Sequence, residues 1–432
     1  VLTPGNRQFL ADNFEFFDDG MAHFFFLRRF NELGERSRHA DWEGDNWRLA
    51  LGLDGEFRND WRWQVDALYG QQNYDIELHG GAYISRLQQA LLVDPASGEC
   101  FDPSNGCAPA DIFGPGRMSP ESVAFLRADA ADVETDNQIQ QLLMFTEGEV
   151  ATWLTEPLTL GLGLEIRREE GEYDPDPELL AGDLWGYDPV DAVDGDFDMA
   201  EAFVEVFLPL LRQARWAEEV SLEAGLRYSD HSEIGDYWTW KSGLSWSPVA
   251  DLRFRAMFQR ATRAPNLEEM YLLINQQEIP AGSPNEPGSV HDPCAASQDP
   301  INKGYTELCV EQGIPREQVG SWEPDPLFLR GYRRGGNQDL DTESADTWTV
   351  GLVWQPSGIA GLSLALDWYS IDIEDAMQWM DSREAIDTCF EVGRSDSEYC
   401  RAFERADSGD IAWEFSTYRN LSKLTAEGVD LQ

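Results

Sequence analysis

Apolar and polar residues alternate with a period of two along many stretches of this chain. Between 47 and 57 nearly every second residue is apolar, and the residues between are mostly small or charged. The stretches 61–69, 160–167 and 252–259 show the same alternation. A period of two places one kind of side chain on each face of an extended strand. The pattern therefore predicts a protein built mainly from β-strands that have one apolar and one polar face.

Turn signals divide the chain into about 12 predicted strands. Short turns, several of them with proline, alternate with longer polar connections, and all six cysteines lie in the longer ones. We treat the segment 230–236 as one of the longer connections and the acidic segment 171–196 as another. The predicted strands lie at 21–32, 47–57, 61–76, 138–154, 160–167, 198–209, 217–229, 237–247, 252–263, 346–355, 361–375 and from about 411 onward.

This order of connections is typical of an outer-membrane barrel, in which short turns form one rim and long loops form the other. Tryptophans beside the short turns fit an interfacial girdle. They are Trp61, Trp63, Trp153, Trp246 and Trp354. The expected fold is all-β: an antiparallel transmembrane β-barrel with long extracellular loops and short periplasmic turns. A soluble sandwich would have shorter strands, and a propeller would show an internal repeat, which we do not find.

The composition narrows the classes of partner. The chain carries 80 acidic and 32 basic residues, a formal net charge of −48. Nucleic acid is thereby excluded as a partner, because binding to phosphates requires Lys and Arg. No run approaches the ~20 apolar residues of a membrane-spanning helix. The acidic excess is read first as a solvated surface that resists aggregation.

Few residues suggest a metal site or a reaction. The cluster Asp191, Asp194, Asp196 and Asp198 does not follow a known calcium loop, so we expect a solvated loop, with calcium as the alternative. The five histidines are scattered in sequence, and no metal site is predicted. No zinc-protease, serine-hydrolase or phosphate-binding motif is present, so we expect no enzymatic activity and no cofactor.

The six cysteines form three close pairs in sequence, all within polar segments. None has the spacing of a zinc or redox site. Local disulfides formed in an oxidising compartment are the favoured interpretation, although six cysteines allow other connectivities. The predicted pairs are Cys100–Cys107, Cys294–Cys309 and Cys389–Cys400.

The strand at 252–263 ends in a distinctive way. Pro265 has no N–H to donate and so stops the ladder. Asn266 and Glu269 follow at the spacing of a capping box, which predicts a short helical turn. On the strand itself, the polar alternates to the apolar row are expected to face the lumen. These are Arg253, Arg255 and Gln259.

At this point the chain resembles a known family, the TonB-dependent outer-membrane receptors. The segment 263–271 is similar to the family's signature at the outer end of a barrel strand, with Met270 in place of the usual Leu. The signature positions are Arg263, Ala264, Pro265, Leu267, Glu269 and Tyr271. Two later segments are also similar to family motifs: Gly336–Glu343, and Asn420 followed by Gly428–Asp430.

The resemblance implies a location in the outer membrane of a Gram-negative bacterium, in contact with membrane lipid. It also implies a barrel of about 22 strands, filled by an N-terminal plug that engages the TonB energising complex. We expect residues 1–432 to be a partial barrel domain without that plug. The implied function is energised import of a scarce nutrient, such as a siderophore, an oligosaccharide or a cobalamin-like ligand. The alternative is a passive porin or a surface adhesin.

Two sets of loop residues are candidates for ligand contact. Guanidinium groups bind carboxylate or phosphate in two-point fashion, and aromatic rings stack on sugars or ring systems. The competing interpretations are ion pairs with neighbouring acids for the arginines and packing within the loops for the aromatics. The candidates are Arg330, Tyr332, Arg333, Arg334, Asn337, Trp322 and Trp379, with Tyr399 and Trp413 as further aromatics.

Overall fold

A computed structural model gives the fold of most of the chain. The strand predicted at 21–32 lies outside the described residues. The model describes residues 38–57, 61–94, 96–113, 116–153, 156–271, 275–280, 292–325 and 328–432.

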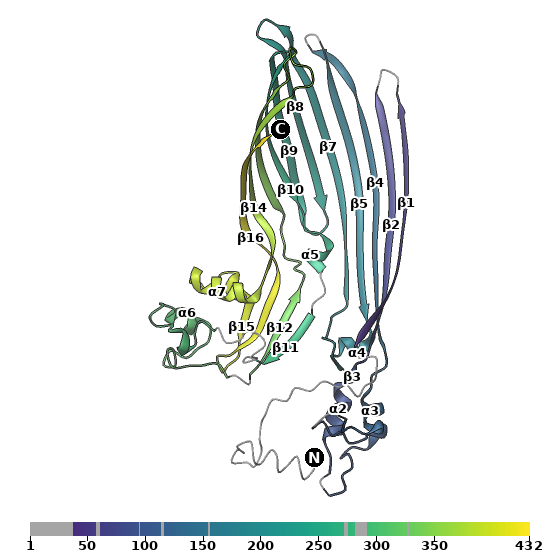
Figure 1. Cartoon of the computed structure of the whole chain (residues 1–432), viewed down its shortest axis with the longest axis vertical. Helices are drawn as coiled ribbons and strands as arrows, with labels where there is room; N and C mark the ends of the chain where they lie inside the picture. The colour runs from purple at the N-terminus through teal and green to yellow at the C-terminus, as the bar shows by residue number, and fades with distance from the viewer. Residues whose placement is uncertain are drawn as a thin grey trace.

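Long antiparallel strands run side by side along the length of the molecule (Figure 1). Eleven of them follow one another in the sheet in chain order, which confirms the remaining predicted strands. The sheet is open, with β1 at one edge. The bounds are β1 His39–Glu56, β2 Arg62–His79, β4 Ala131–Trp153, β5 Glu156–Pro175, β7 Val193–Ala214, β8 Ala217–His231, β9 Gly235–Val249, β10 Leu252–Arg263, β13 Glu343–Trp354, β14 Leu364–Met380 and β16 Ile411–Leu431.

Several shorter strands complete the sheet at its loop end. β12 (Leu329–Gly335) pairs in parallel with β16 and antiparallel with β11 (Asn275–Pro280). β15 (Phe403–Arg405) also pairs with β16. β3 (Ala82–Tyr83) and β6 (Leu184–Trp185) form a separate two-stranded sheet.

The strands are longer than the alternation of apolar residues predicted. β4 has 23 residues and β7 begins at Val193, inside the segment expected to be a solvated acidic loop. Cross-strand ion pairs extend the ladder there: the Arg168 guanidinium lies 2.9 Å from Asp196 and 3.0 Å from Asp198. Charge pairing between neighbouring strands thus replaces the apolar signal beyond the apolar row. The loop prediction was wrong for 171–175, which belong to β5, and for 193–196, which belong to β7.

The alternation of short and long connections is confirmed with one correction. Short turns join β4 to β5, β7 to β8 and β9 to β10 at one rim, and the long connections lie at the other. The exception is β8 to β9, predicted to be long, which needs only residues 232–234. Gly235 accounts for this tight reversal, because its φ of 87° belongs to the left-handed region that favours glycine.

One face of the sheet is an exposed apolar surface. Leu51 is 63 % exposed, Leu164 is 56 % exposed and Val350 is 47 % exposed, all on long strands. A soluble monomer rarely exposes so extended an apolar surface, whereas a membrane barrel presents it to lipid. No helix in the described ranges combines the length and the apolar character required to span a bilayer.

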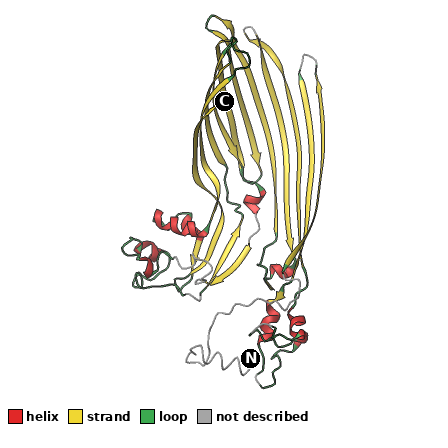
Figure 2. Ribbon diagram, in the orientation of Figure 1, coloured by secondary structure: helices red, strands yellow, loops and turns green. Residues whose placement is uncertain are grey.

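Helices in the described chain gather at the rim of the long loops (Figure 2). α7 begins after Asp381, which accepts the N–H of Arg383, and ends at Gly393 with a φ of 68°, the usual glycine C-cap. The bounds are α2 Ile84–Leu91, α3 Pro120–Leu126, α4 Pro177–Leu180, α5 Leu267–Tyr271, α6 Thr306–Glu311 and α7 Ser382–Val392.

Residues 292–325 and 381–410 fold together into a compact body, here termed the loop unit. Apolar side chains from both segments form one buried core that includes Ile314 and Phe390. Two of the predicted disulfides lie in it, Cys294–Cys309 and Cys389–Cys400. Its interior also holds an ion pair of Arg405 with Asp292, whose side chains are 2 % and 6 % exposed.

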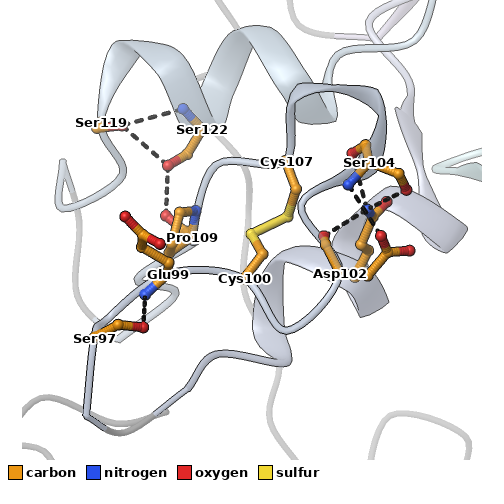
Figure 3. The surroundings of a disulfide bond; sticks show 10 residues. Ser97, Glu99, Cys100, Asp102, Ser104, Cys107, Pro109, Ser119 and Ser122 are labelled. Atoms are coloured by element: carbon orange, nitrogen blue, oxygen red, sulfur yellow. Dashed lines mark hydrogen bonds between the residues drawn. A yellow bond between two sulfur atoms is a disulfide. The ribbon is translucent and has the colours of Figure 1, made fainter.

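The third predicted disulfide, Cys100–Cys107, closes a smaller loop near α2 and α3 (Figure 3). Within that loop the N–H of Ser104 donates to the Asp102 carboxylate at 2.9 Å. This hydrogen bond holds the pKa of Asp102 below its ordinary value. The pairings confirm the disulfide predictions, so both sets of outer loops are covalently fixed.

Candidate functional site at the outer rim

The signature segment at the end of β10 forms the predicted capping box. The N–H of Glu269 donates to Asn266 Oδ1 at 2.8 Å, and the N–H of Asn266 donates to a Glu269 carboxylate oxygen at 2.9 Å. Pro265 is fully buried beside them. The reciprocal bonds satisfy N–H groups at the start of α5. The motif therefore converts a strand end into a fixed helical turn.

Arg263 links this turn to the next strand of the wall. Its guanidinium nitrogens donate to both carboxylate oxygens of Glu269 at 2.8 and 3.0 Å. Its Nε donates to Glu343, at the start of β13, at 2.8 Å. A planar guanidinium is suited to such a bidentate contact. Ala264, which has no polar side-chain group, is half-buried.

The segment Gly336–Glu343 and Asn420 meet at the same turn, whereas Gly428–Asp430 pair with β14 farther along β16. The N–H of Asn337 donates to the carbonyl of Glu269 in α5, and its Nδ2 donates to the carbonyl of Tyr418, each at 2.9 Å. Asn420 Oδ1 accepts the N–H of Asp341 at 2.8 Å. Three segments that are distant in sequence thus form one hydrogen-bonded assembly, here termed the motif junction.

α5 is held against the wall through its last residue. A Cβ at Gly195 of β7 would lie 2.5 Å from the Tyr271 ring, so the ring requires glycine at that position. Leu267 similarly approaches Gly171 of β5. Burial raises the pKa of Tyr271, and nearby carboxylates, including Glu233, raise it further. The signature therefore spans from β10 to β7 across the sheet.

The candidate arginines lie on β12, where alternation separates them. The Arg333 guanidinium stacks over Trp413 at 4.4 Å from the ring centre, and Arg334 stacks over Trp379 at 4.6 Å. Consecutive residues of a strand point to opposite faces, so these two exposed arginines do not form one cluster. The contacts that the structure gives for both guanidinium groups within the described part of the chain are these cation–π contacts.

The other residues of β12 near these arginines differ in burial and packing. Gly331 lies two residues before Arg333, and a Cβ there would lie 2.1 Å from the Trp413 ring, so its absence lets the indole lie on the strand. Tyr332 is half-buried. The backbone of Arg330 belongs to β12, but its side chain lies outside the described part.

The candidate aromatics separate into two environments. Trp379 is half-buried and meets the Tyr418 ring edge-on at 5.1 Å. Trp322 is 8 % exposed in the core of the loop unit, and its indole N–H donates to the carbonyl of Ser408 at 3.1 Å. This position favours packing for Trp322, whereas Trp379 stays beside an exposed arginine.

The polar residues of β10 lie on the face opposite its apolar row. The apolar ring of Phe254 stacks on Trp246 of β9. On the other face, Arg255 makes a bidentate pair with Asp367 at 2.6 and 3.0 Å. Arg253 and Arg255 line one hollow, and Gln259 shares their face by alternation. That this face lines the lumen stays a prediction.

Sequence spacing did not reveal one further group. His39 and His79 are 40 positions apart, but the pairing of β1 with β2 places them directly opposite each other. Their ring nitrogens and a carboxylate oxygen of Asp41 all lie within 4.8 Å of one another. The histidines are scattered in sequence, but the fold brings these two together. Only the strand register could have brought them together.

A single-layer antiparallel sheet with an exposed apolar face, short turns at one rim and folded loops at the other defines the class of outer-membrane β-barrels. Residues 2–432 match the family described as TonB dependent receptor-like, beta-barrel. The chain belongs to this family, which consists of receptors and transporters rather than enzymes. Members of the family are outer-membrane proteins of Gram-negative bacteria.

Among solved structures, similar chains are siderophore receptors of low identity. The siderophore receptor PirA from Acinetobacter baumannii is 13% identical, with a TM-score of 0.48, 91% of this chain covered and 42% of that chain. A mutant of the ferric enterobactin receptor PfeA from Pseudomonas aeruginosa is 13% identical, with a TM-score of 0.45 and coverage of 90% and 40%. The alcaligin receptor FauA from Bordetella pertussis is 10% identical, with a TM-score of 0.40 and coverage of 91% and 43%. The chain spans about two fifths of the length of these receptors.

Proposed function

We propose that this chain supplies barrel wall and outer loops to a receptor that captures an anionic small molecule and imports it with energy from the TonB complex. Membership of the receptor family supports the transport class. The observation that carries the ligand class is the pair of exposed arginines on β12, each stacked on a tryptophan, in a chain of net charge −48.

The chemistry of that pair suits an anionic ligand that carries a ring. A guanidinium that already stacks on an indole keeps its N–H edge available for carboxylate, phosphate or phenolate oxygens. The indole adds apolar area beside it. Siderophores, cobalamin-like ligands and oligosaccharides are the candidates, and acidic groups on the ligand would favour the first two over a neutral sugar.

The motif junction has a different part in this proposal. Its polar groups are engaged with one another, so it is proposed to fix the base of the loops rather than to contact ligand. Asn337 bonds both α5 and β16. The junction would therefore hold β12, which immediately precedes Gly336 in sequence, at a defined position. Ligand contact is assigned to one face of β12, either Arg333 beside Trp413 or Arg334 beside Trp379.

Uptake in the native host tests the proposal. Labelled ferric siderophores, cobalamin and oligosaccharides are supplied to cells with the intact receptor, with and without the energiser. Uptake of one ligand should collapse when the energiser is deleted. Uptake that persists would instead indicate a passive porin, and surface binding with no uptake at all would indicate an adhesin.

Variants then test the ligand contacts. Arg333→Gln and Arg334→Gln each remove a charged hydrogen-bonding group worth ~1.5–3 kcal/mol, so affinity should fall roughly 10- to 100-fold for whichever face binds ligand. Arg383→Gln, an exposed arginine on α7, is the matched control and should bind normally. Unchanged affinity in both β12 variants would contradict the assigned contacts while leaving the transport class intact.

A further inference from the structure

Four polar side chains meet on one face of the edge hairpin formed by β1 and β2. His39 lies opposite His79, and Asp41 lies opposite Glu77, in a register without shifts. Residues two apart on a strand share a face, so all four side chains are neighbours. The hairpin therefore presents two imidazoles and two carboxylates as one compact set at its outer end.

The distances within this set are short. Asp41 Oδ2 lies 3.8 Å from His39 Nε2 and 3.5 Å from His79 Nε2. Glu77 Oε2 lies 3.5 Å from His79 Nε2. The two imidazole rings stack with centres 4.5 Å apart and planes at 10°. The Nε2 of His79 is buried as an atom, and it has no hydrogen-bond partner among the described residues.

We propose that His39, Asp41 and His79, with Glu77 beside them, bind a divalent transition-metal ion of the Zn²⁺ class. Imidazole nitrogen with carboxylate oxygen is a donor set that such ions favour, whereas Ca²⁺ and Mg²⁺ require oxygen ligands throughout. Ligand atoms bound at ~2.0–2.1 Å in a tetrahedral site lie roughly 3.3 Å apart. The observed separations of Asp41 from the histidines exceed that value by only a few tenths of an ångström.

A third segment fixes the backbone at both histidines. The Tyr187 hydroxyl lies 2.6 Å from the carbonyl oxygen of His79 and 3.2 Å from that of His39. Arg38 in turn stacks over the Tyr187 ring at 5.1 Å. Both strand ends therefore contact one tyrosine, which holds the backbone at the two histidines in place. This restraint lowers the ordering cost of forming the site.

The position separates this site from the import pathway. His39 and Asp41 alternate in step with Trp47 and Leu49, so they share the face that carries the apolar row. His39 is eight residues outward from Trp47, roughly 26 Å of strand. An ion would therefore reach the site from the external water, without entering the barrel, and would bridge the ends of β1 and β2.

Zinc binding to the purified intact receptor in detergent tests the proposal. Competition with a chromophoric chelator should detect one Zn²⁺ per receptor that His79→Asn and His39→Asn each weaken at least 10-fold. Glu43→Gln is the matched control, since it removes a carboxylate from the same face two residues beyond Asp41 and should bind as the parent does. Equal binding by all these variants, or none by the parent, would overturn the site.

A second measurement needs no variant. Diethylpyrocarbonate acylates accessible imidazoles, and peptide mass spectrometry then reports the extent at each histidine. Zn²⁺ should protect His39 and His79 together, while Mg²⁺ at the same concentration should not. Acylation of both residues that is unaffected by Zn²⁺ would refute the proposal even if an asparagine variant failed to fold. Neither result depends on which nutrient the receptor imports.

Discussion

The long strands and the loop unit bury their apolar residues in opposite ways. On the strands, Leu51, Leu164 and Val350 are about half or more exposed, on the apolar face of the sheet. In the loop unit, the side chains of Ile314 and Phe390 are only 1 % and 3 % exposed, so the apolar residues form a buried core. One continuous chain therefore follows two rules of burial, separated by the motif junction.

Proteins of this family lie in the outer membrane, where barrel strands meet lipid and outer loops meet water. Lipid accepts an apolar surface, and a sheet in lipid is stabilised by its complete ladder of hydrogen bonds. Water does not accept an apolar surface, so the loop unit must bury its apolar side chains in a core. A core this small is commonly stabilised by disulfides. This contrast also explains why all six cysteines lie in the two loop regions and none lies in a long strand.

The largest expected effect is the loss of a buried partner in the loop unit. Asp292→Ala would leave the Arg405 charge buried and unpaired, which costs about 3–5 kcal/mol. Hydrogen exchange should accelerate across 292–325 and 381–410, while the strands keep their protection. Asp396→Ala, which breaks the exposed pair with Arg394, is the control and should change exchange little. Equal acceleration in the strands would show that the two regions are not independent.

A charge placed on the lipid face should have the next largest effect, in the opposite region. Val350→Arg should destabilise the folded barrel by about 2–4 kcal/mol if the position is near the bilayer centre. The measurement is the folding equilibrium of the intact receptor in lipid vesicles. Thr349→Arg, one residue away on the opposite face, is the matched control. A similar loss in both variants would argue against an outward-facing apolar row.

The smallest expected effect concerns the junction between the regions. Asn266→Ala removes the side chain that accepts the Glu269 N–H, a cap worth about 1 kcal/mol. Hydrogen exchange at α5 should rise several-fold with little change in the strands or the loop unit. Glu268→Gln, in the same turn but outside the capping box, should leave exchange unaltered. If exchange in the loop unit also rose, the junction would be coupled to it more tightly than its contacts indicate.

Much of the fold could be predicted because apolar and polar residues alternate along strands that have one apolar and one polar face. The alternation around Leu49 or Leu164 marks strand and face at once, and Pro265, Asn266 and Glu269 mark a turn by local chemistry alone. The extensions of β4, β5 and β7 were missed because ion pairs such as Arg168 with Asp196 carry no apolar period. Contacts that depend on register, such as His39 with His79, cannot be read from spacing. The burial of Trp322 could not be predicted because nothing local distinguishes a core indole from an exposed one.

The tight turn between β8 and β9 has a consequence for the shape of the rim. The last pair between β7 and β8 joins Met199 to His231, and β7 continues outward for six more residues to Val193, roughly 20 Å of strand. The wall is therefore lower at β8 and β9 than at β4, β5 and β7 (Figure 1). α5 lies against the part of β7 that extends beyond β8, with the Tyr271 ring next to Gly195.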